Sequence, residues 1–193
     1  MKILSPIVGI LWLAWLIFWL ASAFNVKKNA DKSIWKNWWW TRVIIAILVI
    51  ALLEFNDKAK LSFGQTVKSF TSHEITYIGI FGVILVIIGL GFSVWARIHL
   101  GRNWSNYPTH KIDHELVTSG PYRFVRHPIY TGMILGAFGT TLIIGIPWFI
   151  LFLIATVVFL IRITAEEKIM TEQFPDAYPE YKKRTKALIP FIW

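Results

Sequence analysis

The sequence predicts an all-α integral membrane protein with five transmembrane helices, the last two of which form a tight hairpin. Of the 193 residues, 55% are apolar and only 16% are charged, whereas about 25% of the residues of a soluble domain are charged. Several uncharged stretches reach the roughly 20 residues that a helix needs to cross the hydrocarbon core. The longest stretch contains a glycine and a proline near its middle, which favours two helices over one.

The first two spans are predicted in the N-terminal part. Residues 3–24 carry no charge, so they are long enough to cross the bilayer. A cleaved signal peptide is the alternative, because residues 21–23 are small (Ala-Ser-Ala). We favour a span, because the apolar run exceeds the roughly 7–15 residues of a signal sequence and because Lys27 and Lys28 follow it, where positive charge opposes export. Residues 39–53 are the second span, and the three tryptophans at 38–40, where it begins, suit a membrane interface.

The third span, residues 75–95, contains glycines that allow close packing of helices. These glycines are Gly79, Gly82, Gly89 and Gly91. Residues 129–161 carry no charge, and as one helix they would be about 50 Å long, too long for the bilayer. The sequence Gly-Ile-Pro at 145–147 breaks this run. The fourth and fifth spans are therefore predicted at 129–144 and 147–163, antiparallel to each other.

The distribution of basic residues predicts the number of spans and their orientation. The chain has 20 Lys and Arg and a formal net charge of +9. Five spans place sixteen of these residues on the side that holds the C-terminus, whereas four spans would divide them evenly. Cytoplasmic loops carry the excess of Lys and Arg, so we expect the N-terminus outside and the C-terminus in the cytosol. Membrane topology then accounts for the charge without nucleic acid, and residues 1–193 are expected to form a single transmembrane domain.

The predicted hairpin brings two polar segments together on the cytosolic side. Because its two arms are predicted to be equally long, residues 126–130 at the start of one helix meet residues 162–167 at the end of the other. A histidine, a tyrosine, arginines and two adjacent glutamates converge there. We therefore predict a functional site formed by segments 97–132 and 162–193.

Structural explanations compete with a functional one at each of these positions. Pro128 suits the first turn of a helix, Tyr122 and Tyr130 suit a membrane interface, and the arginines suit membrane topology. Glu166 and Glu167 fit such explanations least, because a carboxylate close to hydrocarbon is costly. No metal is expected, since the chain has no cysteine and therefore no thiolate ligand. Ion transport and a nucleotide-binding loop find no support in the pattern either.

Two ordered strings of residues on the predicted site follow a known pattern. The first string is Leu-Val-Thr-Ser-Gly-Pro-Tyr at 116–122 with Arg-His-Pro-Ile-Tyr-Thr-Gly at 126–132. The second string is Glu-Glu at 166–167, Phe174, Tyr-Pro-Glu-Tyr-Lys-Lys-Arg at 178–184 and Ile-Pro-Phe at 189–191. Together the strings resemble the isoprenylcysteine carboxyl methyltransferase family, within the phospholipid and isoprenoid methyltransferases of membranes. The resemblance covers about half of the chain.

The resemblance implies an enzyme that uses S-adenosylmethionine to O-methylate the C-terminal carboxylate of a prenylated cysteine peptide or protein, or of another lipid substrate. Arg162 matches an arginine that holds the substrate, and we expect it to be the catalytic residue. The residues expected to bind the cofactor are His114, Leu116, Val117, Tyr122, His127, Pro128, Tyr130, Glu166 and Glu167. The active site is expected to face the cytosol, at the plasma membrane of a prokaryote or the endoplasmic reticulum of a eukaryote.

Two departures from the family pattern leave other functions open. Ala165 interrupts the acidic run of the family, and its Arg-Val-Pro is Arg-Thr-Lys at 184–186 here. The methyl acceptor could therefore be a phospholipid amine or another isoprenoid, and the chain could also be a non-catalytic membrane scaffold. The residue types suit methyl transfer, because a carboxylate can bind an ammonium, an aromatic ring face attracts a cation such as a sulfonium, and an arginine can hold a carboxylate.

Overall fold

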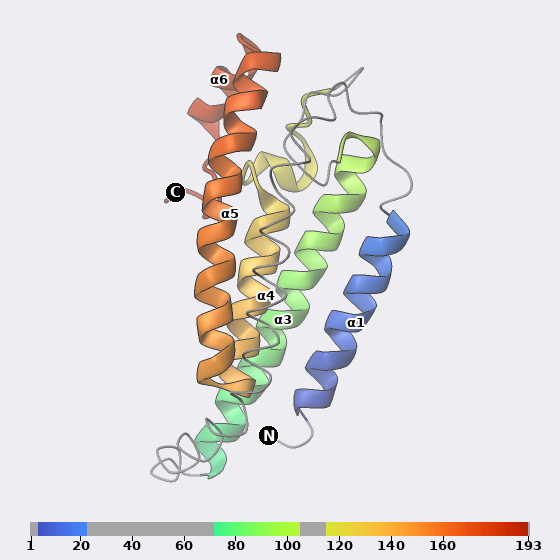
Figure 1. The fold of residues 1–193 in the computed structure, drawn as a ribbon, viewed down its shortest axis with the longest axis vertical. Coiled ribbons are helices and arrows are strands. Elements are labelled where there is room, and N and C mark those ends of the chain that lie inside the picture. Colours follow the sequence, from blue (N-terminus) through green and yellow to red (C-terminus); the bar gives the residue numbers. More distant parts are fainter. Residues whose placement is uncertain (1–3, 23–71, 105–114, 193) are drawn as a thin grey trace.

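The computed structural model describes residues 4–22, 72–104 and 115–192, and the regular elements in these residues are helices joined by shorter non-helical segments (Figure 1). The longer helices are α1 (Leu4–Ser22), α3 (Ser72–Leu100), α4 (Pro128–Ile144), α5 (Ile146–Gln173) and α6 (Ala177–Arg184). Two single turns of 3-10 helix, η2 (Gly101–Asn103) and η3 (Gly120–Arg123), precede α4. The predicted all-α class is confirmed for the described part of the chain. The second predicted span, 39–53, lies outside the described residues.

Three of the described helices are long and apolar enough to cross a membrane. They contain the segments Leu4–Ser22, Tyr77–Asn103 and Trp148–Gln173, while α4 is apolar but shorter, at 17 residues. Their length and composition are those of a membrane protein. The total of five spans and the orientation of the termini stay predictions.

The chain reverses at a single residue, Gly145, between α4 and α5 (Figure 1). Its φ of 101° lies in a region that side chains rarely adopt, and its N–H donates to the carbonyl of Thr141 at 2.9 Å. Halfway along the hairpin, the rings of Phe138 and Phe152 lie 5.6 Å apart. The predicted hairpin is therefore confirmed.

The predicted helix ends need correction at two places. The fifth span was expected to end at residue 163, but α5 continues to Gln173, because residues 164–173 are mostly good helix formers without glycine or proline. Similarly, α3 runs beyond 75–95, from Ser72 to Leu100. Charged residues mark where a helix leaves the hydrocarbon core, but the helix itself can continue beyond them. The two arms of the hairpin are therefore unequal, and the paired glutamates lie within α5.

Glycines bring α3 and α4 into backbone contact. A Cβ added to Gly89 of α3 would lie 2.5 Å from the carbonyl oxygen of Gly132 and from the amide nitrogen of Gly136 in α4. A Cβ added to Gly82 would lie 2.7 Å from the carbonyl oxygen of Gly139. Packing of this kind holds helices together in lipid. The sequence prediction is confirmed for these two glycines and for Gly79, where a Cβ would lie 2.6 Å from Cδ1 of Leu4 in α1. A Cβ on Gly91, in contrast, would meet no described atom within 4 Å.

The first helix is attached to α3 and α4 by polar side chains. Trp15 donates from its indole N–H to Ser93 Oγ at 2.8 Å, and Trp12 donates to Thr140 Oγ1 at 3.0 Å. The buried guanidinium of Arg97 in α3 donates to the carbonyl of Ser22, the last residue of α1, at 2.6 Å. These bonds satisfy polar groups that would otherwise face apolar surroundings, and they fix α1 at one edge of the site described below.

We expect the Gly89→Ala substitution to lower the thermal unfolding temperature of the protein in detergent. Its added methyl group has no room between two backbones, and such overpacking costs about 1–3 kcal/mol. Gly91→Ala is the matched control on the same helix and should be neutral or stabilising, since alanine favours helices. Equal unfolding temperatures for the two variants would contradict the close contact of α3 with α4.

Candidate active site

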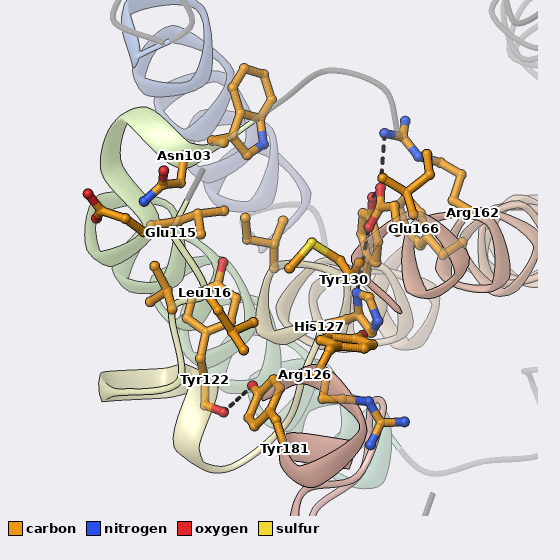
Figure 2. A pocket seen from close by; sticks show the side chains of 18 of the residues that line it. Asn103, Glu115, Leu116, Tyr122, Arg126, His127, Tyr130, Arg162, Glu166 and Tyr181 are labelled. Atoms are coloured by element: carbon orange, nitrogen blue, oxygen red, sulfur yellow. Dashed lines mark hydrogen bonds and ion pairs between the residues drawn. The ribbon is translucent and has the colours of Figure 1, made fainter. Parts of the chain in front are cut away.

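The hairpin brings the start of α4 and the distal part of α5 together around the carboxylate of Glu166 (Figure 2). Its Oε1 accepts a hydrogen bond from the hydroxyl of Tyr130 at 2.5 Å and lies 3.5 Å from Nη2 of Arg162. Its Oε2 lies 3.6 Å from Nδ1 of His127. The predicted convergence of these side chains is confirmed. Their hydrogen bonds and positive charge compensate the negative charge of Glu166, whose side chain is only 23% exposed.

The neighbouring carboxylate, that of Glu167, points to a different set of partners. It lies 2.7 Å from Nε of Arg126 and 2.6 Å from Nζ of Lys182, a residue of α6. It also lies 3.4 Å from Nε2 of His127. Arg126 in turn donates to the carbonyl of Thr185. Glu167 therefore connects the start of α4 to α6, while Glu166 forms part of the site itself.

His127 is the residue that both carboxylates share. Burial opposes its protonation, but the hydrogen bonding and the negative charge of Glu166 and Glu167 outweigh that effect, so the pKa of His127 lies above its ordinary value. The imidazole stacks on the ring of Tyr130 at 5.8 Å, and that ring stacks on Phe159 at 4.8 Å. Protonated His127 is thus stabilised by two carboxylates and held in one orientation.

The segment after α6 returns to the start of α4 and covers it. A parallel β-bridge joins Val125 to Lys186, and the N–H of His127 donates to the carbonyl of Ala187 at 3.0 Å. Because the backbone N–H groups of Arg126 and His127 both donate to this segment, the conformation of residues 125–127 depends on a part of the chain sixty residues away.

Buried tyrosines attach the loop before α4 to α6. The hydroxyl of Tyr181 donates to the carbonyl of Tyr122 at 2.5 Å. Burial raises the pKa of Tyr122 and Tyr178 above the ordinary range and that of Tyr181 to about 12. All three phenols are therefore protonated at neutral pH, so they contribute hydrogen bonds and ring faces and no negative charge.

A cavity of about 250 Å³ opens beside Glu166, and we call it the active-site cavity. Residues of α1, α3, α4, α5 and α6 line it together with η2, η3 and the segment before η3. Seven of the predicted site residues are among them: Leu116, Val117, Tyr122, His127, Tyr130, Arg162 and Glu166. Most of the side chains predicted from the sequence therefore line one cavity.

Three predicted cofactor residues do not belong to this lining as described. Pro128 is buried at the first position of α4, and Glu167 lies on the far side of Arg126, against a second cavity. His114 lies outside the described residues. Among the described residues, no group of three His, Asp or Glu side chains is arranged to hold a metal ion.

Several lining residues were not predicted. Trp19 of α1 and Trp104 after η2 form one wall, and Tyr178 and Tyr181 form another. Oδ1 of Asn103 is buried at the cavity and has no hydrogen-bond partner among the described residues. The tyrosines belong to one of the strings noted in the sequence, so that pattern was available. No sequence signal marks Asn103, because its position depends on how α1 and α3 pack.

The fold and this site define a helical membrane protein with a charged, partly apolar cavity at one end of a helix hairpin. The family model described as phospholipid methyltransferase matches residues 77–177. Protein-S-isoprenylcysteine O-methyltransferase of Schizosaccharomyces pombe is 36% identical over 101 residues, which are 50% of this chain and 43% of that protein.

Two further relatives carry the same description. A probable protein-S-isoprenylcysteine O-methyltransferase of Oryza sativa subsp. indica is 30% identical over 183 residues, 90% of this chain and 87% of its own. The Saccharomyces cerevisiae protein is 36% identical over 117 residues, with 58% and 49% covered. This chain therefore spans less than half of each yeast relative and most of the rice relative. It belongs to the isoprenylcysteine carboxyl methyltransferase family.

We expect the stability of the protein to fall as the pH rises from about 6.5, the ordinary pKa of histidine, through the raised pKa of His127. Below this window the histidine is protonated in both folded and unfolded chains, so the interaction with the two carboxylates stabilises the fold fully. Above it the charge is lost, and the stabilisation with it. Unfolding temperatures between pH 6 and 9 measure the effect. An unchanged pH dependence in the His127→Gln variant would show that this histidine is not the group responsible.

Proposed function

We propose that this chain is an S-adenosylmethionine-dependent methyltransferase that O-methylates the C-terminal carboxylate of an S-isoprenylcysteine. The observation that carries the proposal is the carboxylate of Glu166, held at the wall of the active-site cavity by a tyrosine, a histidine and an arginine. The names of the relatives support the reaction. A cavity with charged and apolar walls suits a charged cofactor and a lipid-modified acceptor.

The side chains around the cavity fit the cofactor. When bound, S-adenosylmethionine supplies a methyl group carried on a positively charged sulfur. Glu166 would hold its ammonium group or a ribose hydroxyl. A backbone N–H at the start of α4 would hold its carboxylate, because both ring nitrogens of His127 face the two glutamates. The ring of Tyr122 or Tyr130 would face a cation or the adenine. The buried Oδ1 of Asn103, which lacks a partner among the described residues, would accept a hydrogen bond from the ligand.

The other predicted cofactor residues have less direct parts in this proposal. Leu116 and Val117 supply an apolar wall of the cavity, and His114 stays a proposed contact. Pro128 and Glu167 would act by position, because the first fixes the start of α4 and the second holds the imidazole of His127.

Arg162 would hold the acceptor. A C-terminal carboxyl group has a pKa of about 3.5, so it is ionised at neutral pH and needs no general base. The guanidinium of Arg162 lies beside Glu166 and over the ring of Tyr130, 5.8 Å from its centre. From there it can bind a carboxylate next to the cofactor, and such alignment can lower a barrier by roughly 7–11 kcal/mol. Met133 and Phe159 line the same cavity and offer apolar surface to an isoprenoid.

We further propose that the chain spans the membrane five times with its C-terminus and active site in the cytosol, which rests on the distribution of Lys and Arg. A phospholipid amine is a second candidate for the acceptor, because the matching family model is described as phospholipid methyltransferase. The two acceptors differ in their proton chemistry. An amine must lose a proton before it attacks, whereas a carboxylate is already ionised.

We expect Glu166→Gln to weaken the binding of S-adenosylhomocysteine about tenfold, the loss of about 1.4 kcal/mol that removal of one charge-assisted hydrogen bond costs. Isothermal titration calorimetry in detergent measures it. Glu180→Gln is the matched control, since this exposed carboxylate pairs only with Lys183 in the described structure. Absence of binding by the unaltered chain would favour a scaffold, and equal affinities in both variants would remove Glu166 from the site.

The acceptor is tested by transfer of a radiolabelled methyl group to farnesylcysteine or to phosphatidylethanolamine. We expect turnover with farnesylcysteine, at a rate that does not require deprotonation of the acceptor. Arg162→Lys should raise the KM for farnesylcysteine and leave the affinity for S-adenosylhomocysteine nearly unchanged, because it removes the planar pair of donors. Turnover with the phospholipid alone, rising with pH, would refute the carboxylate acceptor and retain the methyltransferase.

A further inference from the structure

A second cavity, of about 560 Å³, lies on a different face of α5 from the active-site cavity. Its walls are the distal part of α5, Lys182 of α6 and the segment after α6, which runs back along α5 (Figure 1). Arg126 lines both cavities, and its ion pair with Glu167 lies between them. The proposed methyl transfer makes no use of this second cavity.

One end of the second cavity is strongly basic. Four cations and one carboxylate line it, and the carboxylate of Glu167 is already paired with Arg126 and Lys182. The other two cations, Lys168 and Lys186, are exposed, and within the described residues neither forms an ion pair. This end of the cavity therefore has positive charge left to bind an anion.

The other end is apolar and faces the surroundings of the protein. Leu160 and Ile163 of α5 line it together with Ile192; Ile163 is only 5% exposed, whereas Ile192 is 74% exposed. On the same helix, Val157 and Ile161 are 55% and 57% exposed. Exposed apolar side chains on a helix that is long and apolar enough to cross a membrane suit contact with lipid chains.

The distance between the two ends fits one kind of molecule. Leu160 and Lys168 are eight residues apart on α5, which is about 12 Å along the helix. The headgroup layer on each side of a bilayer is roughly 5–8 Å thick, and a lysine side chain reaches several ångströms toward it. A free phosphate would use only the basic end, whereas a phospholipid would use both.

We propose that the second cavity binds an anionic phospholipid, with its phosphate at Lys168 and Lys186 and an acyl chain along Leu160, Ile163 and Ile192. The lipid is a ligand of the fold and lies apart from the active-site cavity. It would cover the contact between α5 and the segment after α6, whose backbone also holds His127 through Ala187. This inference does not depend on which acceptor is methylated.

The test uses the full chain, purified in detergent and titrated with phosphatidylglycerol, phosphatidylcholine or inorganic phosphate, with native mass spectrometry as the readout. We expect preferential binding of phosphatidylglycerol. The double variant K168Q/K186Q should weaken it roughly tenfold or more, because each lysine contributes to attraction of an anionic headgroup. K183Q/R184Q is the matched control: it removes the same charge from exposed positions on α6 that do not line the cavity.

Retention of phosphatidylglycerol by the control and its loss from K168Q/K186Q would support the proposal. An equal loss in both double variants would overturn it in favour of a diffuse surface charge. Equally tight binding of inorganic phosphate would overturn it in favour of a free-anion site, and equal binding of phosphatidylcholine would show that the cavity does not select charge. Unchanged S-adenosylhomocysteine binding in K168Q/K186Q would show that the variant is folded.

Discussion

The reversal of the chain at Gly145 is the constraint on which the rest of the structure depends. Its φ of 101° lets α4 end and α5 begin without an intervening loop, so the two helices stay in contact along the hairpin. The glycine contacts between α3 and α4 fix a third helix against this pair. With those positions set, the start of α4 lies beside the distal part of α5, where His127 faces Glu166.

The hairpin buries negative charge, and cationic side chains of the site compensate it. Two adjacent carboxylates lie close to apolar helices, where unpaired charge is costly. They point to different partners: Glu166 toward Tyr130 and Arg162 at the cavity, and Glu167 toward Arg126 and Lys182 in front of the segment after α6. Glu166 and its partners therefore supply the chemistry proposed for the site. Glu167 holds Arg126, which in turn bonds the start of the segment after α6.

Features that depend on short-range patterns could be predicted from the sequence. A glycine and a proline within an uncharged run predicted the hairpin, and its arms placed His127 near Glu166. The end of α5 could not be predicted from hydropathy, because a helix continues in water when its residues favour it. The roles of Glu167 and Asn103 were missed for another reason. The role of Glu167 depends on its contacts with Arg126, 41 residues earlier in the chain, and with Lys182 of α6. That of Asn103 depends on the packing of α1 with α3, and neither contact leaves a local pattern.

The hairpin can be tested directly, because the chain has no cysteine of its own. Phe138 of α4 and Phe152 of α5 lie ring to ring, so a chain carrying F138C and F152C should be joined in the membrane by a short bifunctional thiol reagent. A chain carrying F138C and I161C should not, since residue 161 lies about 14 Å further along α5. Cross-linking of the first pair alone is the predicted result. Failure of the first pair, or equal cross-linking of both, would contradict the hairpin and the site built on it.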